Sequence, residues 1–250
     1  MKPDSKLAYD RWHEQINSFA EDTDPLSFPW YRTAFSGIRD NLTGDLLEIG
    51  CGRGEFAVWL ASVVSSIRIT GVDFSASAIN IAHRRVANTS KPVHFIVSDA
   101  QSLAFADNSF DWIVSCECLE HVPQPRKMAA EMFRVLKSGG RFCLTTENYL
   151  NGMLLAWLQC YVSGRPFNSG SGVQPLEQFF VFPQVKGYLK QAGLVVERTE
   201  STHYQWLLLP GVNPARLCTR QFKMSWARRI AKPFGRHFSF FGYKPRFGLE

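Results

Sequence analysis

The chain has 250 residues, of which 45% are hydrophobic and 20% charged, a composition typical of a soluble globular protein with one sizeable core. No apolar run reaches the ~18 residues that would cross a bilayer. The first residues carry acids and no signal-peptide core, and the six cysteines show no paired spacing, so we expect a cytoplasmic protein with reduced thiols.

The net charge of +6 is concentrated in one part of the chain. After Glu200 there are nine basic residues and a single acid, Glu250. The first 200 residues carry 19 basic and 21 acidic groups and are therefore close to neutral. The basic character belongs to a C-terminal segment that needs its own explanation.

Short apolar runs alternate with helical patterns from about residue 44 onward. Ser75 is the expected cap of one helix, Gly139 and Gly140 are expected to end a helical stripe that reaches residue 136, and Gly193 is expected to end the helix near residue 190. Strands are predicted at residues 45–49, 67–72, 93–97, 110–115, 141–146, 194–201 and 237–244.

This alternation predicts an α/β fold, a Rossmann-like doubly wound sheet of seven strands that are mostly parallel. We expect a single domain in four parts. These are an N-terminal helical lid (1–40), a ligand-binding core (41–147), a substrate-side aromatic insertion (148–182), and the C-terminal strands with the basic segment (183–250).

A glycine-rich turn follows the first predicted strand, in the sequence LLEIGCGRGEF (46–56). Three glycines at alternate positions indicate a backbone that turns tightly or closely approaches a ligand. Asp73 ends the second strand nineteen residues after Gly54, which is where an acid accepts hydrogen bonds from a ribose. Phe74 could pack on an adenine ring, and Asp99, which ends the third strand, could accept from its amino group. A tight turn and a helix cap are the simpler explanation of the same residues.

The motifs LLEIGCGRG, GVDFS, VSDAQSLAFADNSFDWIVSCECLEHV and VLKSGGRFCLTTEN occur in order at residues 46–148. In sequence and spacing they resemble the class I S-adenosylmethionine-dependent methyltransferases, of the kind called Methyltransferase type 11. The resemblance implies a sheet whose last strand is antiparallel. It also implies S-adenosylmethionine as cofactor, with Glu48 near its methionine amino end and Asp73 on its ribose. The residues expected to line the cofactor site are Glu48, Gly50, Cys51, Gly52, Gly54, Asp73, Phe74, Asp99, Ala100, Ser115 and Cys116.

Candidates for acid–base chemistry cluster after the fourth strand. Glu117 and His121 are candidate catalytic residues there, and His203 at the end of the sixth strand is a third. Glu117, Glu120 and His121 would share a face of a helical turn and could bind a divalent metal, as the similar ExxEHVP segment of ubiquinone-biosynthesis O-methyltransferases suggests. A hydrogen-bonded His121 beside the cofactor, without a metal, is the preferred alternative.

The aromatic insertion predicts an apolar or aromatic small-molecule acceptor, such as one of secondary metabolism, with O-methylation favoured. Its aromatic residues could equally belong to the core. A nucleic-acid-directed methyltransferase that uses the basic segment on phosphates and a SAM-binding protein without catalysis remain alternatives. Nucleic acid is the less expected partner because no base-methylating motif follows strand four. The oligomeric state is open.

Within the basic segment, Phe222, Trp226 and Ile230 recur every four residues among arginines and lysines. Such a helix suits the headgroup layer of an anionic membrane, so peripheral membrane contact through residues 205–232 is one expectation. The other is that the same apolar residues pack on the sheet as a crossover helix while the charges face water.

Overall fold

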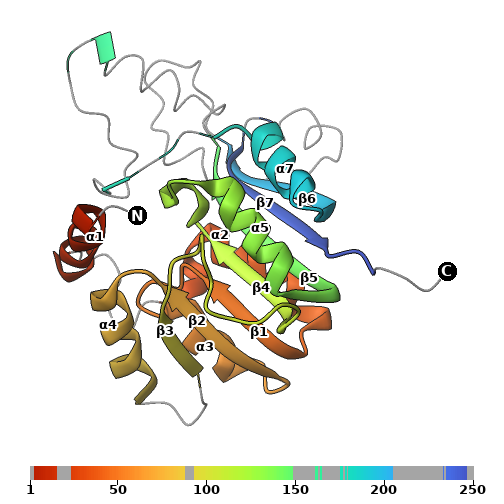
Figure 1. Ribbon diagram of the computed structural model, residues 1–250, viewed down its shortest axis with the longest axis horizontal. Coiled ribbons are helices and arrows are strands. Elements are labelled where there is room, and N and C mark those ends of the chain that lie inside the picture. The colour runs from red at the N-terminus through yellow and green to blue at the C-terminus, as the bar shows by residue number, and fades with distance from the viewer. Residues whose placement is uncertain are drawn as a thin grey trace.

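The structure is a computed structural model built around one central sheet (Figure 1). Within the described ranges no helix has both the length and the apolar character needed to cross a bilayer. The described cysteines 51, 116, 118 and 143 are free thiols. The residues that the structure describes are 3–15, 24–87, 93–148, 161–162, 164, 175–176, 178, 180–204, 233 and 235–246.

The sheet has seven strands in the order β3-β2-β1-β4-β5-β7-β6. The pairs among β1 to β5 are parallel, whereas β7 runs antiparallel to both β5 and β6. The predicted fold, including the antiparallel last strand, is confirmed. The strands are β1 (Gly44–Ile49), β2 (Ile67–Asp73), β3 (Val93–Val97), β4 (Phe110–Cys116), β5 (Leu136–Glu147), β6 (Val195–Tyr204) and β7 (Gly235–Tyr243).

Helices cover both faces of the sheet and bury one apolar core on each. Residues of α2, α3 and α4 pack on one face, and residues of α5 and α7 on the other. A helix on each face is what a parallel sheet with buried strands requires. The helices are α1 (Pro3–Gln15), α2 (Pro29–Ile38), α3 (Glu55–Val63), α4 (Ala76–Ala87), α5 (Pro125–Val135) and α7 (Phe182–Gln191), with short 3₁₀ turns η1 (Pro25–Ser27), η2 (Arg39–Asn41) and η3 (Leu119–His121).

Local chemistry explains two of the helix ends. The Ala78 amide donates to the Ser75 hydroxyl at 3.2 Å, so Ser75 caps α4 as predicted. Gly193, with a φ of 94°, follows α7 in the left-handed region that favours glycine.

The predicted end of α5 was wrong. The helix stops at Val135, and Leu136 already begins β5 opposite Phe110. Gly139 and Gly140 lie inside the strand, where the Gly139 amide donates to the Lys244 carbonyl and the Gly140 carbonyl accepts from the Lys244 amide, both at 2.9 Å. These long-range pairings outweigh the helical periodicity.

Two predicted regions fall largely outside the described residues. The basic segment 205–232 lies wholly outside, and so does most of the aromatic insertion 148–182. Of that insertion, Phe180 is buried in the core beside α5 and α7, and the Phe182 ring stacks on Phe238 at 4.8 Å. Phe180 therefore belongs to the core, and the partly buried Phe182 packs against it.

Strand order determines where ligands can bind. β1 pairs with β2 on one side and with β4 on the other, so the strand order reverses at β1. Ligands of such sheets bind beyond the carboxyl ends of the strands at this reversal. Because β7 is antiparallel, its first residues lie at the same edge, and His237 is in register with Glu147 at the end of β5.

Candidate active site at the carboxyl edge of the sheet

The turn between β1 and α3 is built from glycines with left-handed backbones. Gly50, Gly52 and Gly54 have φ values of 74°, 53° and 78°. A Cβ on Gly54 would lie 2.6 Å from the Phe95 ring, so only glycine lets this turn pack against β3. A Cβ on Gly52 would meet no described atom closer than His13, at 3.8 Å. Gly52 therefore keeps the backbone accessible on that side.

Asp73 holds this turn from the end of β2. Its carboxylate accepts from the Gly52 amide at 3.0 Å and from the Ser75 amide at 2.9 Å. Burial raises the pKa of Asp73, while the hydrogen bonds from Ser75 and Gly52 lower it. The predicted acid and the glycine turn are thus in direct contact.

Glu48 places a buried carboxylate beneath the turn. Only 1% of its surface is exposed, and its Oε2 has no hydrogen-bond partner in the described part of the chain. Burial and the nearby Glu55 raise the pKa of Glu48. Because an orphaned buried acceptor is costly, a bound donor such as the amino group of a ligand would satisfy it.

The residues predicted to contact adenine follow β2 and β3. The Phe74 ring packs edge-on against Tyr9 of α1, with centroids 4.9 Å apart. The Asp99 carboxylate accepts from both the backbone amide and the side-chain amide of Gln101 at 2.9 Å. Ala100 follows Asp99 and is half-buried. The carboxylate of Asp99 is therefore held in a fixed orientation.

Helix α1 covers this edge of the sheet. Its Asp10 accepts from the Ser75 hydroxyl at 2.6 Å and from the Ser77 amide at 3.1 Å. The Arg53 guanidinium donates to the His13 carbonyl, and the Tyr9 hydroxyl donates to the Leu176 carbonyl at 2.9 Å. Burial, with the positive charge of Arg53, lowers the pKa of His13 to about 4, so His13 is neutral near pH 7. The lid role predicted for residues 1–40 stays a prediction.

A cluster of polar groups lies at the end of β4, the central strand of the sheet. Ser115 and Cys116 are buried, and burial raises the pKa of the Cys116 thiol. Glu117 then adopts a φ of 49°, which is uncommon for a residue other than glycine. Such backbone conformations persist where the surrounding structure holds them and occur often at functional sites.

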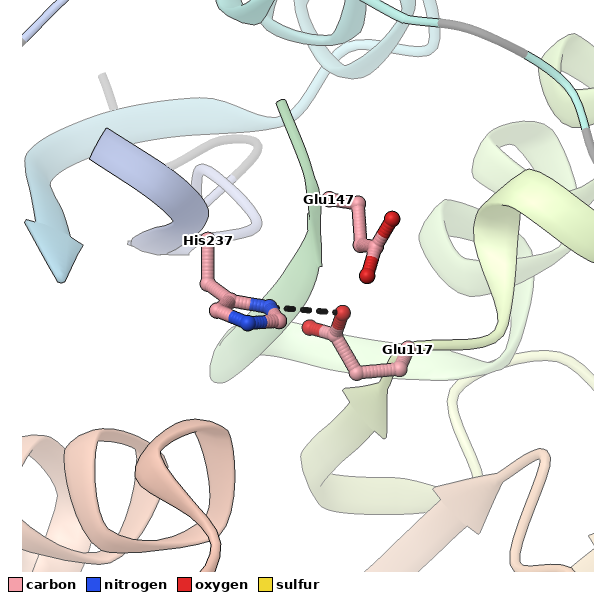
Figure 2. Close-up of side chains that lie close together, drawn as sticks. All are labelled: Glu117, Glu147 and His237. Atoms are coloured by element: carbon pink, nitrogen blue, oxygen red, sulfur yellow. Dashed lines mark hydrogen bonds and ion pairs between the residues drawn. The ribbon is translucent and has the colours of Figure 1, made fainter. Parts of the chain in front are cut away.

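Glu117 lies against two other side chains from neighbouring strands (Figure 2). Its carboxylate accepts from the Thr145 hydroxyl at 2.7 Å and pairs with His237 Nδ1 at 2.9 Å. Glu147 accepts from Arg236 at 3.0 Å. Burial raises the pKa of Glu117, but the charge and the hydrogen bond of His237 lower this pKa by more. The net effect is a lowered pKa. Glu117, Glu147 and His237 offer ligand atoms that all lie within 4.8 Å of one another.

His121 and Glu120 are not part of this cluster. His121 Nδ1 makes a 2.6 Å hydrogen bond to the Leu176 carbonyl, and its ring lies 6.3 Å from that of Tyr9. Glu120 is buried and accepts from the Thr146 hydroxyl at 2.8 Å. The backbone of His203 lies near the end of β6. Among the described residues, the set that could hold a metal is therefore Glu117, Glu147 and His237, whereas metal binding by Glu120 and His121 stays a prediction.

His237 and Glu147 were missed by the sequence analysis. His237 begins the apolar run HFSFF, and Glu147 ends strand five in the sequence TTEN. An antiparallel last strand places its first residues at the carboxyl edge of the parallel strands, so the topology predicted for the sheet could have identified His237.

Comparisons with known proteins agree with this architecture. Residues 47–144 match the family described as a methyltransferase domain. The chain is 31% identical over 133 residues to the ubiquinone/menaquinone biosynthesis C-methyltransferase UbiE of Desulfotalea psychrophila, covering 53% of each chain. It is 32% identical over 148 residues to the ubiquinone biosynthesis O-methyltransferase of Thiobacillus denitrificans, covering 58% of this chain and 60% of the relative. The chain thus spans little more than half the length of these curated relatives.

A solved structure shows the same fold. The phosphoethanolamine N-methyltransferase 2 of Haemonchus contortus, solved with S-adenosyl-L-methionine, superposes with a TM-score of 0.65 at 23% identity, covering 96% of this chain and 56% of that protein. This match extends over almost the whole chain, whereas the matched family runs from within β1 through the glycine turn to within β5. Residues 47–144 therefore match the methyltransferase domain family, and the chain has the fold of solved S-adenosylmethionine-dependent methyltransferases.

Proposed function

We propose that the chain binds S-adenosylmethionine along the carboxyl ends of β1, β2 and β3 and uses it to methylate a small acceptor. The unsatisfied Glu48 oxygen supports this fit, because the methionine amino group could donate to it. The fixed Asp73 and Asp99 carboxylates supply acceptors for the ribose hydroxyls and the adenine amino group. Bound there, the cofactor would supply an electrophilic methyl group.

The acceptor atom is proposed to be an oxygen. A hydroxyl must lose its proton when it is methylated, and this requires a basic or charge-stabilising group next to the reacting atoms. Glu117 follows Cys116 directly at the end of β4 and is held in place by Thr145 and His237. This preorganised carboxylate is the observation that carries the proposal. One of the two quinone-pathway relatives is named a C-methyltransferase and the other an O-methyltransferase. Their names therefore do not distinguish a carbon acceptor from an oxygen acceptor.

An aromatic surface beside Glu117 favours an apolar or aromatic acceptor. The Trp30 ring lies 5.2 Å from the His237 ring, and Phe28 stacks on Trp30 at 5.0 Å. Both aromatic residues are only partly buried. Flat apolar side chains next to a few polar groups are typical of small-molecule sites.

The proposal is tested by offering phenols, catechols and hydroquinones, with RNA as a separate acceptor, together with methyl-labelled S-adenosylmethionine. Mass spectrometry should place the label on an oxygen of a small aromatic acceptor. Glu117→Gln should lower turnover by about 10²–10⁴-fold, the range for a lost acid–base group, while the affinity for S-adenosylhomocysteine stays within about twofold. The exposed Glu197→Gln is the matched control. Label on carbon or on RNA would contradict the proposal.

A further inference from the structure

Glu117, Glu147 and His237 together have the side-chain composition of a cation-binding site. The set predicted from the sequence, Glu117, Glu120 and His121, shares only Glu117 with this cluster. The three residues come from the end of β4, the end of β5 and the start of β7, and the sheet topology alone brings them together (Figure 2). Glu147 and His237 are buried, at 8% and 4% exposed. Two carboxylates and an imidazole are hard-to-borderline donors that suit Mn²⁺, Mg²⁺ or Zn²⁺.

Each carboxylate is oriented by a neighbour outside the three. Thr145 donates to Glu117 Oε1 at 2.7 Å, and Arg236 donates to Glu147 Oε1 at 3.0 Å. The other oxygen of Glu117, Oε2, is the atom that faces His237 Nδ1. Metal-binding carboxylates commonly have such outer hydrogen bonds, which fix the oxygen that faces the ion.

The distances suit a shared ion after a small adjustment. Two ligands at about 2.1 Å from a cation and at right angles to each other are about 3 Å apart. The observed separation of Glu117 Oε2 from His237 Nδ1 is 2.9 Å. All three ligand atoms lie within 4.8 Å of one another, whereas ligands on opposite sides of an ion would be about 4.2 Å apart. A shift of roughly half an ångström therefore closes the site.

The charges around the cluster favour a cation. Glu120, buried behind it, interacts unfavourably with both Glu117 and Glu147. Arg236 is the permanent cation among the described groups that face these carboxyls, and His237 adds a charge only when protonated. Crowded, buried acidic groups favour a bound cation, because an opposite charge nearby stabilises their ionised forms.

We propose that Glu117, Glu147 and His237 bind a divalent cation that receives the acceptor oxygen beside the methyl donor. This role rests on the proposed O-methylation, whereas the binding of the ion does not. A hydroxyl bound to the cation releases its proton to solvent more readily. Its oxygen then forms a bond to the methyl carbon while the carbon–sulfur bond breaks and its electron pair stays on sulfur.

The test is a Mn²⁺ titration of the chelator-treated full chain, followed by electron paramagnetic resonance without cofactor or acceptor. The parent protein should bind one Mn²⁺, and echo modulation from a coordinated imidazole nitrogen should appear. Glu147→Gln and His237→Gln should each weaken Mn²⁺ binding at least tenfold. Mg²⁺ or Zn²⁺ should displace the bound Mn²⁺.

Matched controls separate this site from the alternatives. The exposed residues Glu197 and His94 provide the controls Glu197→Gln and His94→Gln, which should leave the affinity within twofold. His121→Gln should also leave it unchanged, because His121 is not one of the three clustered residues. Loss of Mn²⁺ in His121→Gln would instead assign the ion to the Glu117, Glu120 and His121 set.

The parent protein decides the outcome even if a variant fails to fold. An absence of stoichiometric Mn²⁺, or bound Mn²⁺ without nitrogen modulation, overturns the site and leaves Glu117 and His237 as a hydrogen-bonded pair. Because no acceptor is present, that result would not affect the proposed O-methylation. If Mn²⁺ binds but no acceptor oxygen is methylated, the proposed O-methylation and the ion's role in it would be overturned. The cation site itself would stand.

Discussion

At the scale of single residues, Asp73 combines two roles. It fixes the glycine turn through the Gly52 amide and the start of α4 through the Ser75 amide, and it is proposed to hold the ribose. Asp73→Ala should weaken binding of S-adenosylhomocysteine by ~1.5–3 kcal/mol, the cost of losing a hydrogen bond to a charged group. Isothermal titration calorimetry measures this loss. The exposed Asp40→Ala is the control, and equal affinities in all three proteins would remove Asp73 from the cofactor site.

Gly52 and Gly54 form a matched pair because both are left-handed but only one is crowded. Gly54→Ala would place a Cβ 2.6 Å from Phe95, so it should destabilise the fold by more than the ~1–2 kcal/mol of left-handed strain. Gly52→Ala meets no such neighbour and should incur only that strain, while hindering the cofactor's approach. Urea unfolding should therefore rank Gly54→Ala as the less stable variant. Calorimetry should find that Gly52→Ala binds S-adenosylhomocysteine more weakly than its parent, and the reverse stability order would contradict this account.

At the scale of elements, α1 is joined to α4 by Glu14, whose carboxylate accepts from the Ser77 hydroxyl at 2.8 Å, and by Asp10. The Asp10 carboxylate accepts from the Ser75 hydroxyl and the Ser77 amide, and both bonds bridge the two helices. Asp10→Ala should therefore loosen α1 without disturbing the sheet. Hydrogen exchange should speed up in residues 3–15, and S-adenosylhomocysteine should dissociate several-fold faster in stopped flow.

The control for this helix is Asp40→Ala, which changes an exposed carboxylate away from α4. Faster exchange spread evenly over the sheet would mean that Asp10 stabilises the whole fold. Unchanged dissociation with a loosened α1 would show that the helix does not control cofactor release.

At the scale of the whole molecule, the excess positive charge lies mostly between residues 205 and 232, outside the described residues. Contact with an anionic membrane through this segment stays a prediction. Each basic residue near an anionic surface contributes ~1 kcal/mol, and salt screens that attraction. The chain should therefore float with anionic liposomes at low salt and less with neutral liposomes or at high salt.

Charge reversal identifies the segment responsible. Replacing Arg228 and Arg229 by Glu should abolish flotation, whereas replacing the exposed Arg39 and Arg84 by Glu should reduce it only slightly. Equal recovery with anionic and neutral liposomes would reject the membrane contact and leave the charge to solubility or to an acidic partner.

The sequence by itself determined the features that depend on neighbouring residues. Short apolar runs located all seven strands, although β5 begins at Leu136 and not at the predicted residue 141, and the glycines at 50, 52 and 54 marked the turn that Asp73 holds. These predictions succeeded because strand periodicity, a helix cap such as Ser75 and a left-handed turn are each encoded within a few consecutive positions.

Only the tertiary structure decided what the carboxyl edge of β4 faces. Glu117, Glu147 and His237 are far apart in the sequence, and their meeting depends on the antiparallel direction and exact register of β7 against β5. The same long-range pairing ended α5 at Val135 against its own periodicity. A strand's partner is chosen by non-local hydrogen bonds and packing, which no local pattern specifies, so the composition of this cluster became visible only once the sheet was assembled.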